Sequence, residues 1–74
     1  MSNEEQSRII ARNLERLLSD NHMSQARLAE ILGVSESAVG KWILRRNSPS
    51  MGNIQKIADY FNIPKSFILE DSYA

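Results

Sequence analysis

Apolar residues recur at the spacing of a helix in two long segments of the chain. The first segment carries Ile10, Leu14, Leu17 and Leu18. The second carries Ile54, Ile57, Ala58 and Phe61. Residues three or four apart lie on one side of a helix, so each set predicts an amphipathic helix, over about residues 4–20 and 51–61.

The segment between them, residues 25–44, reads as two short helices joined by a tight turn. The first helix is expected over about residues 25–32, and Gly33 ends it with the backbone freedom that a turn needs. The second follows a capping Ser35 and runs to about Leu44. The residues expected to face inward are Leu28, Leu32, Val39 and Trp42. This pattern predicts a helix-turn-helix unit whose second helix leaves its outer face open.

The last part of the chain predicts a loop and one more short helix. Pro49 disfavours helix at the residue before it, so residues 45–50 read as a loop. A fifth helix is expected over about residues 64–69. The apolar residues expected to close the core there are Phe67 with Ile68 or Leu69.

Five helices without a strand signal predict an all-α fold in one domain. We expect the domain to span residues 1–74, with its core over about 4–69 and residues 70–74 as a frayed tail or the start of a linker. A chain of 74 residues with 42% hydrophobic content suffices for one small core. Because the chain has no cysteine, helix packing must hold this core together.

The formal net charge is zero, but the charges are unevenly distributed. Residues 24–48 carry four basic against two acidic side chains, and residues 59–74 carry one basic against three acidic. The basic part coincides with the predicted helix-turn-helix unit, which favours nucleic acid as a partner. The chain shows neither a membrane-spanning apolar run nor a secretory signal, so a reduced, cytoplasmic compartment is expected.

Two segments carry a family resemblance, MSQARLAEILGVSESAVGKW and NSPSMGNIQKIADYFNIPKSFIL. They resemble the lambda-repressor-like helix-turn-helix family, above all the amino-terminal domains of Gram-positive phage repressors, over about residues 10–69. The resemblance implies a five-helix domain that binds a double-stranded operator as a dimer. Many relatives have Glu-x-Gly where this chain has Ile43 and Arg45. A positive φ at Arg45 would cost roughly 1 kcal/mol relative to glycine.

The outer face of the second short helix supplies the candidate base-reading residues, Glu36, Ser37, Gly40 and Lys41. Lys41 can reach guanine O6 and N7 or a phosphate, and Ser37 can bond to base edges or a phosphate. Glu36 suits cytosine N4, or equally complements the helix dipole. Gly40 fits either close packing against a neighbouring helix or close approach to DNA, and the sequence leaves both open.

The candidate phosphate-binding residues are Gln25, Ser35, Arg45, Arg46 and Asn47. In similar repressors a glutamine at the place of Gln25 joins the phosphate backbone to a side chain of the reading helix; its plainer role is that of a first-turn residue. Ser35 caps a helix whatever the function. The other three follow the reading helix, where a loop faces the adjacent DNA backbone, although a solvated loop would have the same composition.

The remaining polar and aromatic residues have plainer interpretations. Trp42 is expected in the core rather than against a base. Arg8, Arg12 and Arg16, spaced by four, read as a solvated face with local carboxylate pairs rather than a DNA contact. His22 is the only histidine and lies in a turn, so the sequence predicts no enzyme, metal site, cofactor or small-molecule substrate.

These features predict a sequence-specific transcription regulator that binds double-stranded DNA, most like a phage or prophage repressor. A homodimer with reading helices one helical turn apart would require an inverted-repeat operator. The alternative is a helical protein-interaction module, such as an antitoxin or antirepressor-target domain, in which Arg45 and Arg46 meet an acidic partner. The dimer surface stays open, with candidates Phe67, Ile68, Leu69 and Tyr73.

Overall fold

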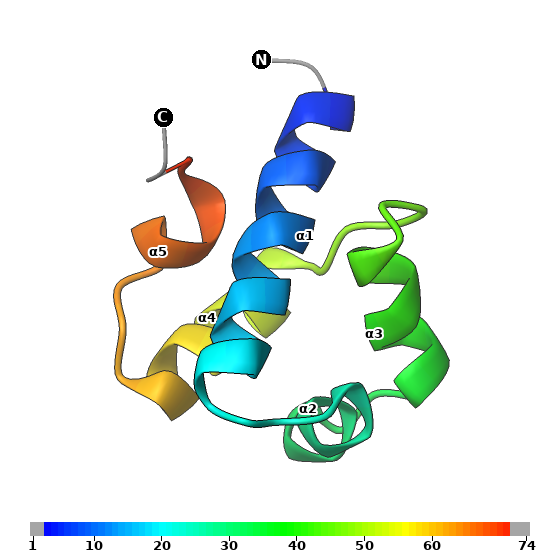
Figure 1. Ribbon diagram of the computed structural model, residues 1–74, viewed down its shortest axis with the longest axis vertical. Coiled ribbons are helices and arrows are strands. Elements are labelled where there is room, and N and C mark those ends of the chain that lie inside the picture. Colours follow the sequence, from blue (N-terminus) through cyan, green and yellow to red (C-terminus); the bar gives the residue numbers. More distant parts are fainter. Residues whose placement is uncertain (1–2, 72–74) are drawn as a thin grey trace.

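The computed structural model describes residues 3–71, and all regular secondary structure within them is helical. The helices are α1 (Asn3–Asp20), α2 (Gln25–Leu32), α3 (Glu36–Ile43), α4 (Met51–Phe61) and α5 (Ser66–Leu69). In Figure 1, α1 runs along the middle of the molecule, with α3 on one side, α5 on the other and α2 at its lower end. The predicted all-α fold is confirmed, and α2 and α4 have the predicted bounds.

One core draws on all five helices. Its buried residues are Ile10, Leu14, Leu18, Leu28, Ala29, Leu32, Val39, Trp42, Ile54, Ile57, Ala58 and Ile68. Leu17 and Phe61 lie partly buried at its edge. The helical spacing of apolar residues therefore identified the faces of α1 and α4 that are buried, because both stripes lie against this core.

Local contacts set most of the helix ends. Ser24, Ser35 and Ser50 each precede a helix in an extended conformation and accept a hydrogen bond from the backbone N–H three residues later, at 3.0–3.1 Å. Gly33 and Asn62 end α2 and α4 in the left-handed conformation, with φ of 72° and 56°. Caps of this kind satisfy backbone groups that a helix leaves unpaired at its ends.

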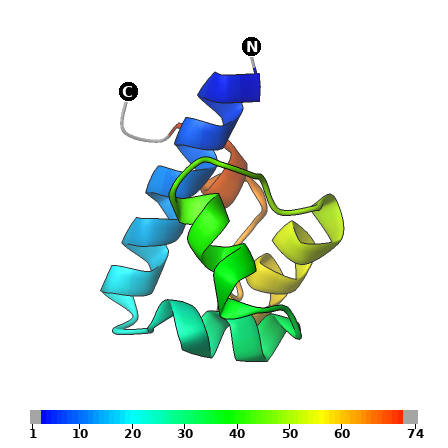
Figure 2. The same cartoon turned by 90° about the vertical axis from the view of Figure 1, so that its right-hand side faces the viewer.

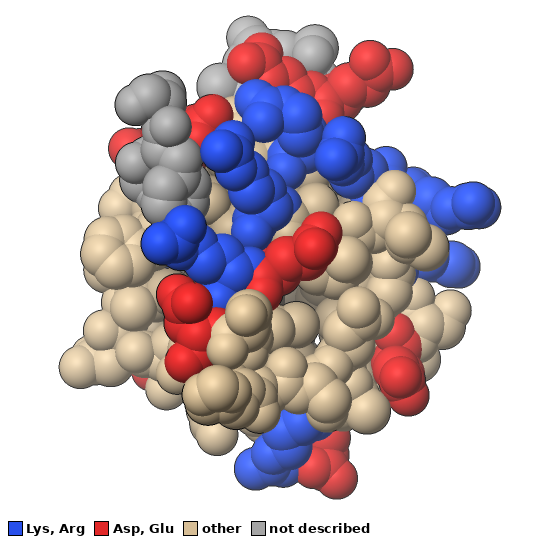
Figure 3. Space-filling model, viewed as in Figure 1, with Lys and Arg blue, Asp and Glu red and all other residues tan. Residues whose placement is uncertain are grey.

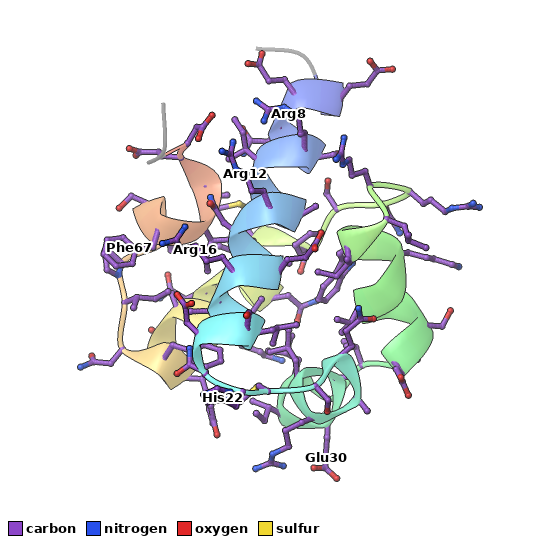
Figure 4. All side chains as sticks on the ribbon, viewed as in Figure 1. Arg8, Arg12, Arg16, His22, Glu30 and Phe67 are labelled. Carbon is purple, nitrogen blue, oxygen red and sulfur yellow. The ribbon has the colours of Figure 1, made fainter. Side chains whose placement is uncertain are left out.

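The prediction that Phe67 closes the core is wrong. Its side chain is 58% exposed, whereas that of Ile68 is 1% exposed. Successive residues of a helix point about 100° apart, and in this helix it is Ile68 that faces the core, while the position before it points to solvent. Figure 4 shows Phe67 projecting from the outer edge of α5. The helix also begins at Ser66, two residues later than expected.

Side chains of α1 hold the C-terminal segment in place. The buried Asn13 donates from Nδ2 to the backbone carbonyls of Ile68 and Glu70, at 2.8 and 2.9 Å. Gln6 donates from Nε2 to the carbonyl of Leu69 at 3.1 Å. Because these bonds reach three successive carbonyls, the chain lies along α1 as far as Glu70.

The carboxylate of Asp71 continues this contact with α1. It lies 3.8 Å from the guanidinium of Arg8 and 3.5 Å from that of Arg12. Fraying was expected from residue 70 onward, but Glu70 and Asp71 contact α1. Residues 72–74, and with them Tyr73 as a candidate for the dimer surface, lie outside the described residues.

Candidate nucleic-acid interface

The outer side of α3 is open to solvent, while its inner side packs against α2 and α1. Val39 and Trp42 are 0% and 4% exposed, which confirms that Trp42 belongs to the core. Glu36, Ser37 and Lys41 are exposed on the opposite side. Figure 2 shows α3 in front of the molecule with α2 crossing below it, and no other helix covers α3 in this view.

Gly40 faces the first residue of α2, the helix that packs against α3. A Cβ built on Gly40 would meet only the side-chain Oε1 of Gln25, at an ordinary contact distance of 3.6 Å. Close packing between helices therefore does not require glycine here, although the sequence left that explanation open. The side chain of Gln25 lies beside α3 at this point. The open side of Gly40 suits the close approach of a DNA backbone or base.

The end of α3 is a left-handed turn centred on Arg45. Arg45 has φ 63°, as expected for a residue that replaces glycine, and the backbone N–H of Arg46 donates to the carbonyl of Lys41 at 2.9 Å. This pattern is a Schellman motif, which normally takes glycine at the left-handed position. Arginine in this conformation costs roughly 1 kcal/mol relative to glycine.

The loop after this turn is anchored to α1. The hydroxyls of Ser48 and Ser7 are hydrogen-bonded at 2.9 Å, and Pro49 is buried. Arg46 and Asn47 stay exposed on the loop. Asn47 accepts a hydrogen bond from the backbone N–H of Ser48 through Oδ1 at 3.1 Å. The anchored loop can therefore hold Arg46 and Asn47 in a fixed place beside the reading helix.

Comparison with known proteins identifies the fold. Residues 14–68 match the helix-turn-helix family. The chain belongs to this family. It is also similar to a solved structure, that of the SOS-response transcriptional repressor LexA from Eubacterium rectale, with 35% identity and a TM-score of 0.86. The alignment covers 93% of this chain and 73% of that one, and no curated protein sequence matches.

These findings make the chain a helix-turn-helix DNA-binding domain of the kind found in transcription regulators. His22 is exposed in the turn after α1, and the described residues hold no cluster of three metal-ligating side chains. None of the described helices is both long and apolar enough to cross a membrane.

The basic residues of this helix-turn-helix domain fall into two groups. Some pair with carboxylates on their own helix, as Arg16 does with Asp20. Arg27 pairs with Glu30, whose hydrogen bond and charge raise the pKa of the guanidinium. Lys41, Arg45 and Arg46, by contrast, make no ion pair within residues 3–71. These three cations belong to α3 and the loop after it.

Sequence reasoning missed one feature of this surface. Arg45 does not stand alone in the loop but lines an open hollow of about 290 Å³ with Arg8, Arg12 and Glu15 of α1. The spacing of the α1 arginines identified a polar ridge. Local pairing is confirmed for Arg8 with Glu5 and for Arg16 with Asp20, whereas Arg12 forms an ion pair with the distant Asp71. No signal in the sequence showed that the loop after α3 returns to this ridge.

Proposed function

We propose that this domain binds an inverted-repeat DNA operator as a homodimer and acts as a repressor of the phage or prophage type. The observation that carries the proposal is the open ridge of α3 from Ser37 to Lys41, in a helix-turn-helix domain whose core residues all lie on the other side. The name of the similar solved structure, a transcriptional repressor, supports the repressor role. We further propose that the domain works in the cytoplasm, where its DNA target lies.

The exposed residues divide between reading and anchoring. We assign base contacts to Glu36, Ser37, Gly40 and Lys41, which share the outer side of α3. We assign phosphate contacts to Gln25, Ser35, Arg45, Arg46 and Asn47, which flank that helix at both ends. Gln25 supports this division because its side chain lies beside Gly40 at the start of α2. The N-terminus of α3, which Ser35 caps, adds a partial positive charge for a phosphate.

The assignment of residues to base contacts or phosphate contacts is tested by measuring base preference and overall affinity for DNA separately. Lys41→Ala and Ser37→Ala should each change discrimination at particular operator positions by about 1–3 kcal/mol. Arg46→Ala should weaken binding to all sequences similarly and reduce the salt slope by about one. Selection of bound sites from random DNA, followed by titrations at several salt concentrations, measures both. A change in only one base preference for Arg46→Ala would contradict the division.

The same selection tests the dimer. Reading helices about 34 Å apart on one face of a duplex require half-sites one helical turn apart, in inverted orientation. Recovery of a single asymmetric site would count against the homodimer. Weak binding that salt erases completely, with no sequence preference, would instead favour the alternative of a protein-interaction module, in which Arg45 and Arg46 contact an acidic protein.

A further inference from the structure

A second basic surface adjoins the reading helix on the side of α1. Its centre is the hollow lined by Arg8, Arg12, Glu15 and Arg45. Arg45 is the second residue after the end of α3, so the hollow begins where the reading helix stops. In Figure 3 the blue surface of Lys and Arg runs along the upper part of α1 toward the loop that follows α3. The two basic surfaces are therefore continuous.

Three guanidinium groups and one carboxylate, that of Glu15, line this open hollow, so its basic side chains outnumber its acidic one. The acidic groups near them are Glu15 in the wall, Glu5 at 4.0 Å from Arg8, and Asp71, which both Arg8 and Arg12 approach. Asp71 belongs to the C-terminal segment rather than to the wall of the hollow. One carboxylate from that segment thus partly neutralises two of the three arginines.

The backbone at Arg45 gives an independent reason to assign this hollow a role. Arg45 holds φ 63° without glycine, a conformation that costs free energy in the folded protein. The left-handed turn directs the chain back toward α1, and Arg45 reaches the hollow from there. A glycine would form the same turn more easily but would leave the hollow with two arginines instead of three.

We propose that Arg8, Arg12 and Arg45 bind a backbone phosphate of DNA just beyond the half-site that α3 reads, and that Asp71 competes with that phosphate. This inference rests on the proposed function, because it extends the same DNA surface. Duplex DNA presents phosphates at regular spacing along its edge, so a longer duplex supplies a group that a minimal half-site lacks. Asp71 then limits the affinity for flanking DNA without touching the reading helix.

The experiment compares two lengths of DNA. A minimal half-site duplex and the same duplex extended by about five base pairs, half a helical turn, at one end or the other are titrated at several salt concentrations. We expect the extension on the α1 side to tighten binding roughly threefold to tenfold and to steepen the salt slope by about 0.9. Arg12→Ala should abolish this gain and leave binding to the minimal duplex unchanged.

Arg16→Ala is the matched control. Arg16 lies four residues further along the same ridge of α1, but it pairs with Asp20 and does not line the hollow (Figure 4). This variant should keep the full gain from the extension. Asp71→Asn should increase the gain by about threefold, because it removes the competing charge. Circular dichroism confirms that each variant is folded, as expected for changes in exposed ion pairs.

The outcomes separate the inference from the function it rests on. Equal affinity for the minimal and extended duplexes, with operator binding intact, overturns the inference alone. The inference is also overturned if Arg16→Ala, like Arg12→Ala, no longer binds the extended duplex more tightly than the minimal one. If millimolar inorganic phosphate at constant ionic strength erases the gain, the hollow takes free phosphate and its assignment to DNA is wrong. Failure to bind any duplex selectively overturns the proposed function and the inference with it.

Discussion

The α2–α3 unit and the C-terminal segment of residues 66–71 both pack against α1, but they depend on contacts of different range. In the α2–α3 unit, Ser24 and Ser35 cap helices through backbone groups three residues away, and Gly33 forms the turn by its own conformation. In the C-terminal segment, side-chain hydrogen bonds to the backbone come from Gln6 and Asn13, 55 to 63 positions earlier in the chain. The first region is determined locally and the second by distant side chains.

The largest effect should come from the buried residue of the C-terminal segment. Ile68→Ala removes a side chain that is 1% exposed and is expected to lower the free energy of unfolding by about 2–5 kcal/mol. Phe67→Ala, its neighbour, removes a larger side chain that is 58% exposed and should change stability by about 0.5 kcal/mol or less. Urea unfolding of both variants measures the difference. Similar losses for the two would mean that Phe67 is covered in solution.

A smaller effect should follow from loss of the long-range hydrogen bonds. Asn13→Ala leaves the carbonyls of Ile68 and Glu70 without their donor and is expected to cost about 1–3 kcal/mol. Asn21→Ala is the matched control, since its exposed amide bonds only to the carbonyl of Leu17, four residues away. Urea unfolding gives the stabilities, and amide exchange of residues 66–70 shows where the loss occurs. If Asn21→Ala costs as much as Asn13→Ala, long-range contacts do not dominate this segment.

This difference between local and long-range contacts explains how much of the fold could be predicted from the sequence. The bounds of α2 and α4 were predicted correctly because serine caps, Gly33 and Asn62 act on their own neighbours. The start of α5 and the exposure of Phe67 were not predicted correctly, because a single helical turn has too few residues to define a periodic face. The role of Asn13 was not predicted, because the sequence does not indicate to which distant carbonyls a single asparagine on an apolar helix face will donate.

The candidate site follows the same rule. The exposure of Ser37 and Lys41 was predicted because helical periodicity separates them from Val39 and Trp42, and this separation is observed. At Gly40, packing against α2 leaves room for a Cβ, because only the side chain of Gln25 lies there, and no spacing in the sequence specifies the position of that side chain. Likewise, the sequence left open whether Arg45 takes a positive φ, and it did not show that this residue joins the arginines of α1.

The smallest expected effect compares the two left-handed turns of the reading unit. Arg45→Gly relieves roughly 1 kcal/mol of backbone strain but gives up about 0.4–1 kcal/mol through the greater freedom of the unfolded chain, so a net gain of about 0.5 kcal/mol or less is expected. Gly33→Ala has the opposite effects on backbone strain and on the freedom of the unfolded chain, so its free energy of unfolding should fall by about as much. No atom lies within 4 Å of a Cβ at Gly33, so this variant reports φ alone. Urea unfolding measures both. If the free energy of unfolding changes in the same direction in both variants, Arg45 is not held at positive φ in solution. If it rises in Arg45→Gly and falls in Gly33→Ala, this chain keeps a strained arginine beside α3 where a glycine would be more stable.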